Sequence, residues 1–214
     1  VDDGERVAPG NVLAEVTAPT RTLLTTERTM LNILSHASGI ATATRRWVDA
    51  VDGTGARIRD TRKTLPGLRE LQKYAVRAGG GVNHRMGLGD AAMIKDNHVA
   101  AVSRGVVAAL AAVRAHAPDL PCEVEVDTLD QLDALLRLSE PPQLVLLDNF
   151  SVADTAEAVR RRDQVAPGCE LESSGGLTLE RARAYAETGV AYLAVGALTH
   201  SVSALDIGLD YLGD

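Results

Sequence analysis

Basic side chains are concentrated in three consecutive segments of the chain. Arg62 and Lys63 lie in RDTRK, His84 and Arg85 in NHR, and Lys95 in IKDN. Guanidinium groups bind carboxylate or phosphate through two parallel hydrogen bonds, while a lysine supplies a point charge. Cations that converge in one pocket lose hydration, and they therefore require an anionic ligand. The pattern predicts a site for a multiply anionic substrate, although each residue alone could instead lie on a solvated, salt-bridged surface.

Carboxylates form a second candidate group. Glu125 lies within EVEVD, and Asp148 closes LVLLD. A carboxylate at a strand end can hold Mg²⁺, bind ribose hydroxyls, or stabilise positive charge on a sugar carbon as pyrophosphate leaves. Glu123 and Asp127 share one strand face with Glu125, because side chains alternate with a period of two. The pattern alone does not choose among these three residues.

Two glycine-containing segments suggest phosphate binding. Ser174 and Gly175 belong to ESSGG, and Gly196 begins GALTH. Glycines let backbone amides approach an anion, and the N-terminus of a following helix adds a favourable dipole. A single SGG usually marks a turn. Two such loops after the last two strands of a barrel, where barrels commonly bind phosphate, predict a phosphate site.

The elements that would position these residues repeat one theme beyond residue 55, in which a short apolar run is followed by a helical pattern. The predicted strands are 56–60, 92–94, 123–126, 144–147, 170–173 and 192–195. The predicted helices are 68–78, 103–116, 129–138, 152–162 and 178–187. Alternating strands and helices imply a parallel sheet, with chemistry at the carboxyl ends of its strands. No GxGxxG follows a first strand, which favours a barrel over an open doubly wound sheet.

The segment before the barrel has a different pattern. Turn signals at Asp3-Gly4 and Pro9-Gly10 flank short apolar runs and predict short antiparallel strands. From Thr26 apolar residues recur at helical spacing, which predicts one long helix or two consecutive helices with Gly39 as a break or a close-packing point. Because the chain starts at Val1 within this pattern, we expect an earlier part of the same domain to be missing.

Composition limits the possible functions. The 214 residues are 45% hydrophobic and 24% charged, which is typical of a globular protein. A formal net charge of -7 argues against broad binding to nucleic acid or anionic membranes. Neither an apolar stretch of about 18 residues nor a signal peptide is visible, so we expect a cytoplasmic protein. Cys122 and Cys169 fit no metal or redox spacing and are predicted to be reduced structural thiols.

Longer motifs carry a family resemblance that extends from about Gly4 to Gly208. They are ERTMLNILSHASGIAT, RDTRKTLPGLRELQKYAVRAGGGVNHR, GDAAMIKDNH, EVEVD, LLDN, ESSGG and VGALTH. DTRKT followed by PGLR and GGGxNHR is highly specific, and the chain resembles the quinolinate phosphoribosyltransferases. The resemblance implies an α/β barrel of parallel strands over residues 30–214, with a C-terminal tail. It also implies part of an open β-sandwich domain over residues 1–29.

The resemblance further implies an activity and its partners. Quinolinate and phosphoribosyl pyrophosphate would give nicotinate mononucleotide, pyrophosphate and CO₂ in de novo NAD biosynthesis, with Mg²⁺ as cofactor. The enzyme would be a homodimer with shared active sites, or a higher oligomer. Residues implied for quinolinate are Arg28 from the partner subunit, Arg62, His84, Arg85 and Lys95. Those implied for phosphoribosyl pyrophosphate are the catalytic Lys63, Glu125 and Asp148, the last two also binding metal, and the phosphate-loop residues Ser174, Gly175, Gly196 and His200.

Three other functions compete with this interpretation. A nicotinate phosphoribosyltransferase would bind a single carboxylate, for which so many cations are unnecessary. A barrel aldolase or isomerase would require a Schiff-base lysine, and Lys95 is the obvious candidate. DGERVAPGNVL also resembles half of a biotinyl or lipoyl carrier domain, but the chain has no lysine before Lys63.

Overall fold

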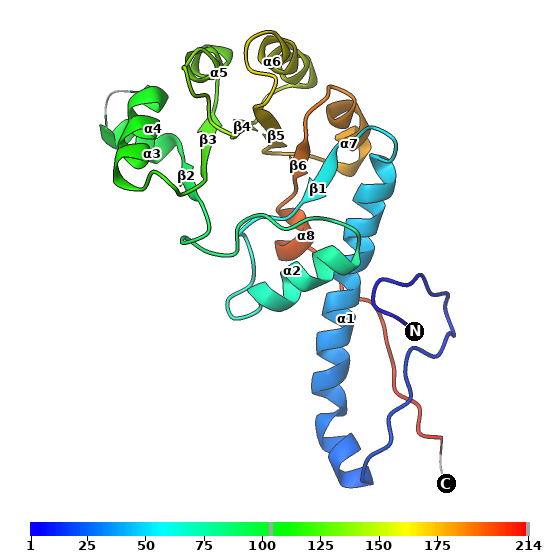
Figure 1. The fold of residues 1–214 in the computed structure, drawn as a ribbon. Helices are drawn as coiled ribbons and strands as arrows, with labels where there is room; N and C mark the ends of the chain where they lie inside the picture. The colour runs from blue at the N-terminus through cyan, green and yellow to red at the C-terminus, as the bar shows by residue number, and fades with distance from the viewer. Residues whose placement is uncertain (103–104, 213–214) are drawn as a thin grey trace.

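A curved, parallel β-sheet forms the centre of the computed structural model, which describes residues 1–102 and 105–212 (Figure 1). Its six strands follow the order β1-β6-β5-β4-β3-β2, and every pairing is parallel. The strands are β1 (Arg57–Arg59), β2 (Ala92–Ile94), β3 (Cys122–Val126), β4 (Leu144–Asp148), β5 (Glu170–Ser174) and β6 (Tyr192–Ala194). All six predicted strands are confirmed, and β2 has the predicted bounds.

Helices cover the outer face of this sheet (Figure 1). They are α3 (Asp96–Val102), α4 (Gly105–His116), α5 (Leu129–Leu136), α6 (Val152–Val165) and α7 (Leu179–Ala186). Helices α2 (Arg69–Ala78) and α8 (Ala197–His200) lie below the sheet, beside the long helix that precedes the barrel (Figure 1). The five predicted helices are confirmed, although the predicted start of one, at Ser103, lies outside the described residues. Side-chain caps help to fix two starts, because Thr128 accepts a hydrogen bond from Gln131 N and Ser151 from Asp154 N.

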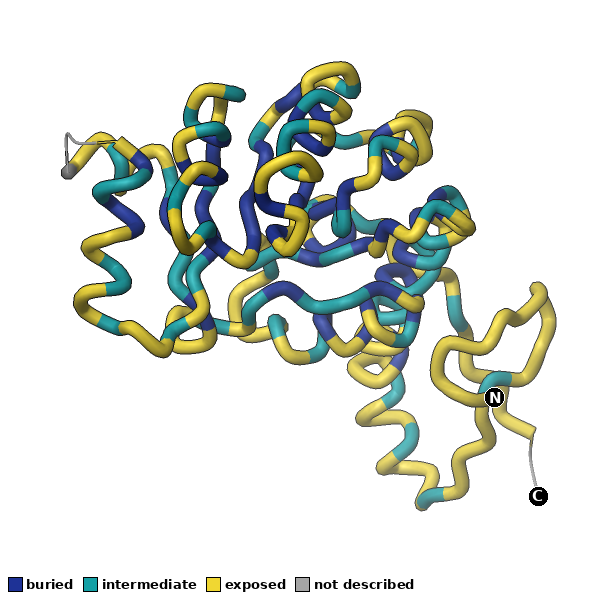
Figure 2. Tube along the Cα trace, turned by 45° about the horizontal axis from the view of Figure 1, so that its top comes forward, coloured by how far each residue is buried: buried dark blue, intermediate teal, exposed yellow. Residues whose placement is uncertain are grey.

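The two faces of the sheet differ in chemistry. Val124, Val126 and Leu171 are fully buried in the apolar core that includes the covering helices. Alternate residues on the same strands, Glu123 and Glu172, contact basic side chains instead. Buried residues therefore follow both the strands and the inner sides of the helices, as Figure 2 shows. The period of two places the apolar core outside the sheet and charged groups inside it.

The sheet is barrel-like, with β1 and β2 at its two edges. The chain after α2 extends the curve beside β1, because Val82 N donates to Ile58 O at 2.8 Å and Asp60 N donates to Val82 O at 3.2 Å. This bridge brings residues 82–85 next to the end of β1. Segments that are more than 20 residues apart in sequence thus meet at the carboxyl end of one strand.

A single long helix, α1 (Thr20–Ala50), precedes the barrel. Its second half packs through Ile40, Thr44 and Trp47, whereas its first half projects away from the sheet (Figure 1). We call residues 20–34 the arm. Gly39 does not break the helix: a Cβ atom there would lie 2.2 Å from Ser203 O, so the glycine permits close packing of the C-terminal segment.

Residues 1–19 contain the predicted turns but not the predicted strands. Glu5 N donates to Asp2 O and Asn11 N to Ala8 O, each at 3.1 Å, as expected for the two turn signals. Neither apolar run pairs with another strand, and Val12 is 69% exposed. A strand needs a ladder of backbone hydrogen bonds and a buried face, and among the described residues this segment forms no such ladder and is mostly exposed. The strand prediction was wrong for this reason, while α1 crosses residues 29 and 30 without interruption.

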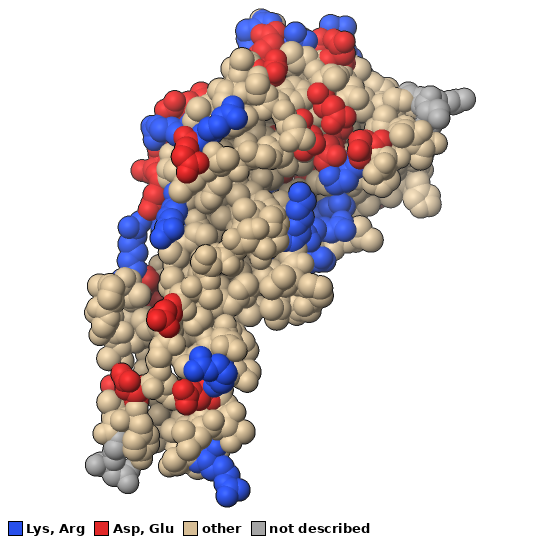
Figure 3. Space-filling model, turned by 180° about the vertical axis from the view of Figure 1, so that it is seen from behind, with Lys and Arg blue, Asp and Glu red and all other residues tan. Residues whose placement is uncertain are grey.

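Charged side chains are unevenly distributed over the surface. On the face seen in Figure 3, basic and acidic groups lie side by side on the larger upper part, while uncharged side chains dominate the narrow lower part. Within the described part of the chain, no helix is both long enough and apolar enough to cross a membrane.

Candidate active site at the carboxyl ends of the strands

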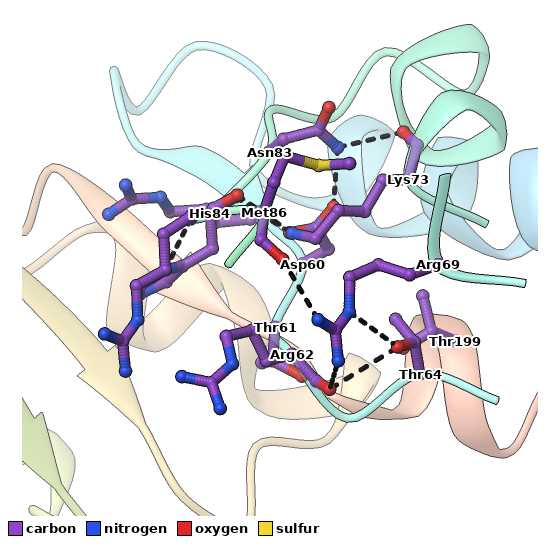
Figure 4. A network of polar contacts seen from close by, with 12 residues as sticks. Asp60, Thr61, Arg62, Thr64, Arg69, Lys73, Asn83, His84, Met86 and Thr199 are labelled. Carbon is purple, nitrogen blue, oxygen red and sulfur yellow. Dashed lines mark hydrogen bonds and ion pairs between the residues drawn. The ribbon is translucent and has the colours of Figure 1, made fainter. Parts of the chain in front are cut away.

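The loop after β1 carries Arg62 and Lys63, and an arginine of α2 holds it in place. Arg69 Nε donates to Thr64 Oγ1 at 3.0 Å, and Arg69 Nη1 donates to Met86 O at 3.1 Å (Figure 4). A third guanidinium nitrogen lies 3.5 Å from Arg62 O. Arg69, the arginine of PGLR, therefore joins the loop after β1 to the segment that follows His84 and Arg85.

The guanidinium groups of Arg62 and Arg85 lie near each other beside these two segments. Burial and the charge of Arg62 lower the pKa of Arg85, although Glu123 and Asp90 oppose the shift. Arg85 Nη1 donates to Ala91 O at 2.8 Å, and Arg62 Nε is buried without a hydrogen-bond partner in the described part of the chain. None of the ion pairs among the described residues involves either arginine. Such an arrangement favours an anion with two acceptor groups.

The ring of His84 faces the interior of the barrel. Its Nδ1 accepts a hydrogen bond from Arg85 N at 2.8 Å, which assigns the ring proton to Nε2. Nε2 lies 3.0 Å from Glu123 Oε2 and 3.6 Å from Glu172 Oε1. The ring nitrogen therefore lies close to two carboxylates, although neither facing oxygen has a hydrogen-bond partner among the described residues. The proposed contact of His84 with substrate stays a prediction.

Arg59 completes a buried cluster below this ring. Its Nη1 lies 2.8 Å from Glu172 Oε2, and its Nη2 lies 3.4 Å from Glu123 Oε1. Burial raises the pKa of Glu172 despite the nearby charge of Arg59. Burial acts in the same direction on Glu123, but His84 and Arg59 outweigh it and the pKa of that carboxyl is lowered. Two neighbouring glutamates are thus shifted in opposite directions.

The predicted acidic residues lie at the ends of neighbouring strands. Lys95 forms an ion pair with Glu125, whose side chain is 9% exposed. Asp148 Oδ2 accepts a hydrogen bond from Asn149 Nδ2 at 2.7 Å, and the residue is half-buried. The described residues contain no group of three or more potential metal ligands from His, Cys, Asp and Glu. Glu125 and Asp148 therefore provide separate carboxylates and no complete metal cage.

The loops after β4 and β5 fit closely together. Asn149 has a left-handed backbone with φ of 57°, and its N donates to Ser174 O at 2.9 Å. Gly175 has φ of 84°, and a Cβ atom there would lie 2.3 Å from Asn149 Oδ1. Both facts exclude a side chain at position 175 without rearrangement. The close contact with Asn149 therefore fixes the course of the loop beside Ser174.

The loop after β6 approaches Lys63. A Cβ atom at Gly196 would lie 3.3 Å from Lys63 Cδ and 3.1 Å from His200 Nε2. Thr199 Oγ1 donates to Lys63 O at 2.8 Å, which attaches α8 to the loop after β1. The structure thus brings together Lys63, Gly196 and His200 beside the cationic site.

Comparison with known proteins now defines the family. The model of the quinolinate phosphoribosyl transferase C-terminal domain matches residues 40–210, and that of the N-terminal domain matches residues 1–38. This chain belongs to the quinolinate phosphoribosyltransferase family. A carboxylating nicotinate-nucleotide pyrophosphorylase from Mycobacterium leprae is 70% identical over 210 residues, which cover 98% of this chain and 73% of that protein.

Further members of the family are similar to this chain in sequence and in structure. The probable enzyme of the same name from Bacillus subtilis is 44% identical, over 97% of this chain and 70% of that protein. The crystal structure of NadC from Streptococcus pyogenes has a TM-score of 0.90 and 39% identity, covering 100% of this chain and 74% of that one. The predicted quinolinate phosphoribosyltransferase fold is confirmed, including its α/β barrel class.

Arg28 was predicted to belong to the site, but within one chain it lies away from the other predicted site residues. It is exposed on the arm, which projects away from the sheet (Figure 1). Sequence reasoning missed Arg59 and Lys73 and assigned no specific role to Asp60 and Asn149. Glu172 was included in the phosphate segment ESSGG, but its pairing with Arg59 depends on strand register.

Proposed function

We propose that this quinolinate phosphoribosyltransferase transfers phosphoribose from phosphoribosyl pyrophosphate to the ring nitrogen of quinolinate and releases pyrophosphate and CO₂. The product is nicotinate mononucleotide, a precursor in NAD biosynthesis. The observation that carries this proposal is the juxtaposition of Arg62 and Arg85, neither of which forms an ion pair with a carboxylate among the described residues. A pyridine dicarboxylate would supply the two missing anions, and we place this reaction in the cytoplasm.

The side chains divide between the two substrates. Arg62 and Arg85 hold the ring carboxylates, and His84 and Lys95 close the same site. Lys63 stabilises the pyrophosphate as it leaves, while Ser174, Gly175, Gly196 and His200 bind phosphate groups. Orientation of the ring nitrogen toward C1 of the ribose makes the transfer intramolecular in character, which accelerates it.

The acidic residues act on the sugar. Asp148, half-buried at the end of β4, stabilises positive charge that develops at C1 as the bond to pyrophosphate lengthens. Glu125 supports this field once Lys95 turns toward substrate, because the two are paired in the free chain. Alkylation of the nitrogen makes the ring an electron sink, so the bond from C2 to its carboxylate breaks and CO₂ leaves. A proton then replaces it at C2.

Magnesium fits this site only together with substrate. Mg²⁺ usually binds one or two protein carboxylates and completes its shell with phosphate oxygens and water. Asp148 is accessible and Glu125 becomes free if Lys95 moves, so these residues would hold the ion that accompanies pyrophosphate. Bound there, Mg²⁺ would neutralise negative charge on the leaving group.

A second copy of the chain would complete the site. The arm exposes several apolar side chains, which a dimer interface would cover: Leu24, Met30, Ile33 and Leu34. Arg28 lies on the same arm, so a homodimer would carry it to the partner's barrel. Support for this proposal comes from the arm's exposure and from the distance in sequence between Arg28 and the barrel strands.

The ion pair of Lys95 bears on the aldolase alternative. A Schiff-base lysine needs a free amine to attack a carbonyl, whereas the ammonium group of Lys95 is held in an ion pair with Glu125. Borohydride treatment with a sugar phosphate should therefore trap no adduct on Lys95.

The function is tested by measuring CO₂ release from carboxyl-labelled quinolinate with and without phosphoribosyl pyrophosphate. We expect release only when both substrates and Mg²⁺ are present. Nicotinate serves as the matched control, and mononucleotide formation from nicotinate at a higher kcat/KM would replace this proposal with the single-carboxylate alternative.

A further inference from the structure

An ion pair lies completely inside the protein behind the cationic site. Lys73 of α2 contacts Asp60, which follows β1, and both side chains are 0% exposed. Burial lowers the pKa of Lys73, and the hydrogen bond and charge of Asp60 oppose this shift. Removing two charges from water is costly, and a buried ion pair is often no more stabilising than an apolar pair of similar size. Stability alone therefore does not account for the Lys73–Asp60 pair, and its other hydrogen bonds indicate what else it does.

Both backbone polar groups of His84 are bonded to the pair. Asp60 Oδ1 accepts a hydrogen bond from His84 N at 2.8 Å, and Lys73 Nζ donates to His84 O at 2.9 Å (Figure 4). Asn83 adds a third connection, since its Nδ2 donates to Asp60 Oδ2 at 2.5 Å and to Lys73 O at 2.9 Å. The pair thus fixes the backbone on both sides of His84.

The same pair joins the two halves of the cationic site. Asp60 precedes Arg62 by two residues, and His84 precedes Arg85 by one. Displacement of Asp60 relative to residues 83–85 would change the separation of the two guanidinium groups. We infer that Asp60 and Lys73 are positioning residues, which set the spacing of Arg62 and Arg85 for a dicarboxylate through the backbone of His84. The inference rests on the proposed function.

An apolar pair could fill the same volume but could not make these bonds. His84 is 6% exposed, so its N–H and C=O would be left buried and unpaired. Either group would then shift to find another partner, and Arg85 would move with it. Errors of about 1 Å in the placement of a substrate group can reduce a rate by about a hundredfold. Geometry, more than net stability, explains the presence of the pair.

The test uses Asp60→Asn combined with Lys73→Met, which removes both charges and leaves neither one unbalanced. Binding is measured by calorimetry, and turnover by CO₂ release. We expect the Kd of quinolinate to rise by about tenfold or more, with the Kd of phosphoribosyl pyrophosphate changing by less than about threefold. Lys73→Met alone leaves Asp60 without its cation, so its Tm should be lower than that of the double variant.

A control variant removes a different ion pair, which is only partly buried and lies away from the site. Arg161 of α6 and Asp133 of α5 lie 3.0 Å apart on the outside of the barrel. Arg161→Met with Asp133→Asn should lower the Tm without changing quinolinate affinity. Asn83→Ala provides a second probe that buries no charge, and it should weaken quinolinate selectively by a smaller factor. It serves as the deciding variant if the double variant does not fold.

Two results would overturn the inference. One is an unchanged quinolinate Kd in the folded variants, and the other is equal weakening of both substrates in proportion to the fall in Tm. If the wild-type protein releases no CO₂ from quinolinate, the proposed function is rejected. The dicarboxylate would then no longer be the ligand that explains the spacing of Arg62 and Arg85. Active wild type with unaffected variants would reject the positioning role alone.

Discussion

The rim of the barrel and the arm of α1 use their side chains in opposite ways. At the rim, residues from β1, α2 and the segment 82–85 bury charged groups against each other, so one chain fixes their geometry. On the arm, large apolar residues such as Leu24 and Ile33 are 70% and 48% exposed. The comparison teaches that contacts within one chain organise the cationic pocket, whereas the same chain leaves large apolar side chains of the arm exposed.

The largest expected effect is on activity, when one substitution is made on the arm and another at the rim and the two variants are combined in one dimer. Arg28→Ala and Lys95→Ala should each abolish nearly all activity, but mixed dimers would contain one site with neither substitution. After the two variants are unfolded together and reassembled, about half of the dimers are mixed, and activity should reach roughly one quarter of wild type. Absence of recovery, with subunit exchange demonstrated, would place Arg28 in its own subunit's site and break the comparison.

The next effect concerns one substrate at the rim. Arg85→Ala should weaken quinolinate by about 2–5 kcal/mol, because it removes one partner of a charged hydrogen bond to a bound anion. Phosphoribosyl pyrophosphate should bind almost as before. Calorimetric titration with each substrate measures both affinities, and equal losses would show that Arg85 does not distinguish them.

A pair of core and arm substitutions compares stability directly. Leu171→Ala, at a fully buried position of β5, should lower the free energy of unfolding by about 2–5 kcal/mol. Ile33→Ala should change it by less than about 0.5 kcal/mol at protein concentrations where the chain is monomeric. Urea unfolding at several concentrations provides the measurement. Comparable losses in the monomer would mean that the arm is covered by its own chain.

The smallest effect is a change in pH dependence. The folded chain retains a proton on Glu172 where the unfolded chain has released it, since burial raises this pKa. Its contribution to stability is complete below the ordinary carboxyl pKa of 4.5 and is lost as pH rises through the folded pKa. Glu172→Gln should therefore show a smaller loss of stability above pH 4.5 in urea unfolding experiments.

Glu157 on α6 gives a control of the opposite sign. Hydrogen bonds from Arg160 and Arg161 lower its pKa to about 2, so its contribution is present above pH 4.5 and is lost as pH falls toward 2. The Glu157 side chain is partly exposed, and salt should screen the effect. An unaltered pH profile for Glu172→Gln would indicate that the carboxyl is ionised in the folded chain.

The sequence predicted correctly those strands and helices that are determined by the local spacing of apolar residues. Strand 92–94 was bounded correctly because its apolar run is short and polar residues follow it, and the rim residues were found from their positions after strands. Helix α3 was not predicted, because polar residues of IKDN follow strand 92–94 directly. In the structure His98 N and Val99 N donate to Lys95 O and begin the helix. The same polar residues are compatible with a loop and a helix start.

The polar network behind the site could not be predicted in the same way. Arg59 contacts Glu172 across 113 positions of sequence, and no local pattern specifies that pairing. Lys73 also fits the amphipathic pattern of α2 as an ordinary surface lysine, yet it is completely buried. Its position depends on where Asp60 lies in three dimensions. Local periods therefore predict the elements and the rim, while contacts between elements decide which charges are buried.

The pairing of β1 with β6 has a consequence for synthesis of the chain. Arg57 lies opposite Tyr192, so the first strand of the sheet obtains this neighbour only after 135 further residues have been made. At typical translation rates this interval is on the order of ten seconds, during which one edge of β1 lacks its final partner. The nascent chain thus carries an incomplete sheet until its closing strand emerges, and protection from premature association matters most in that interval.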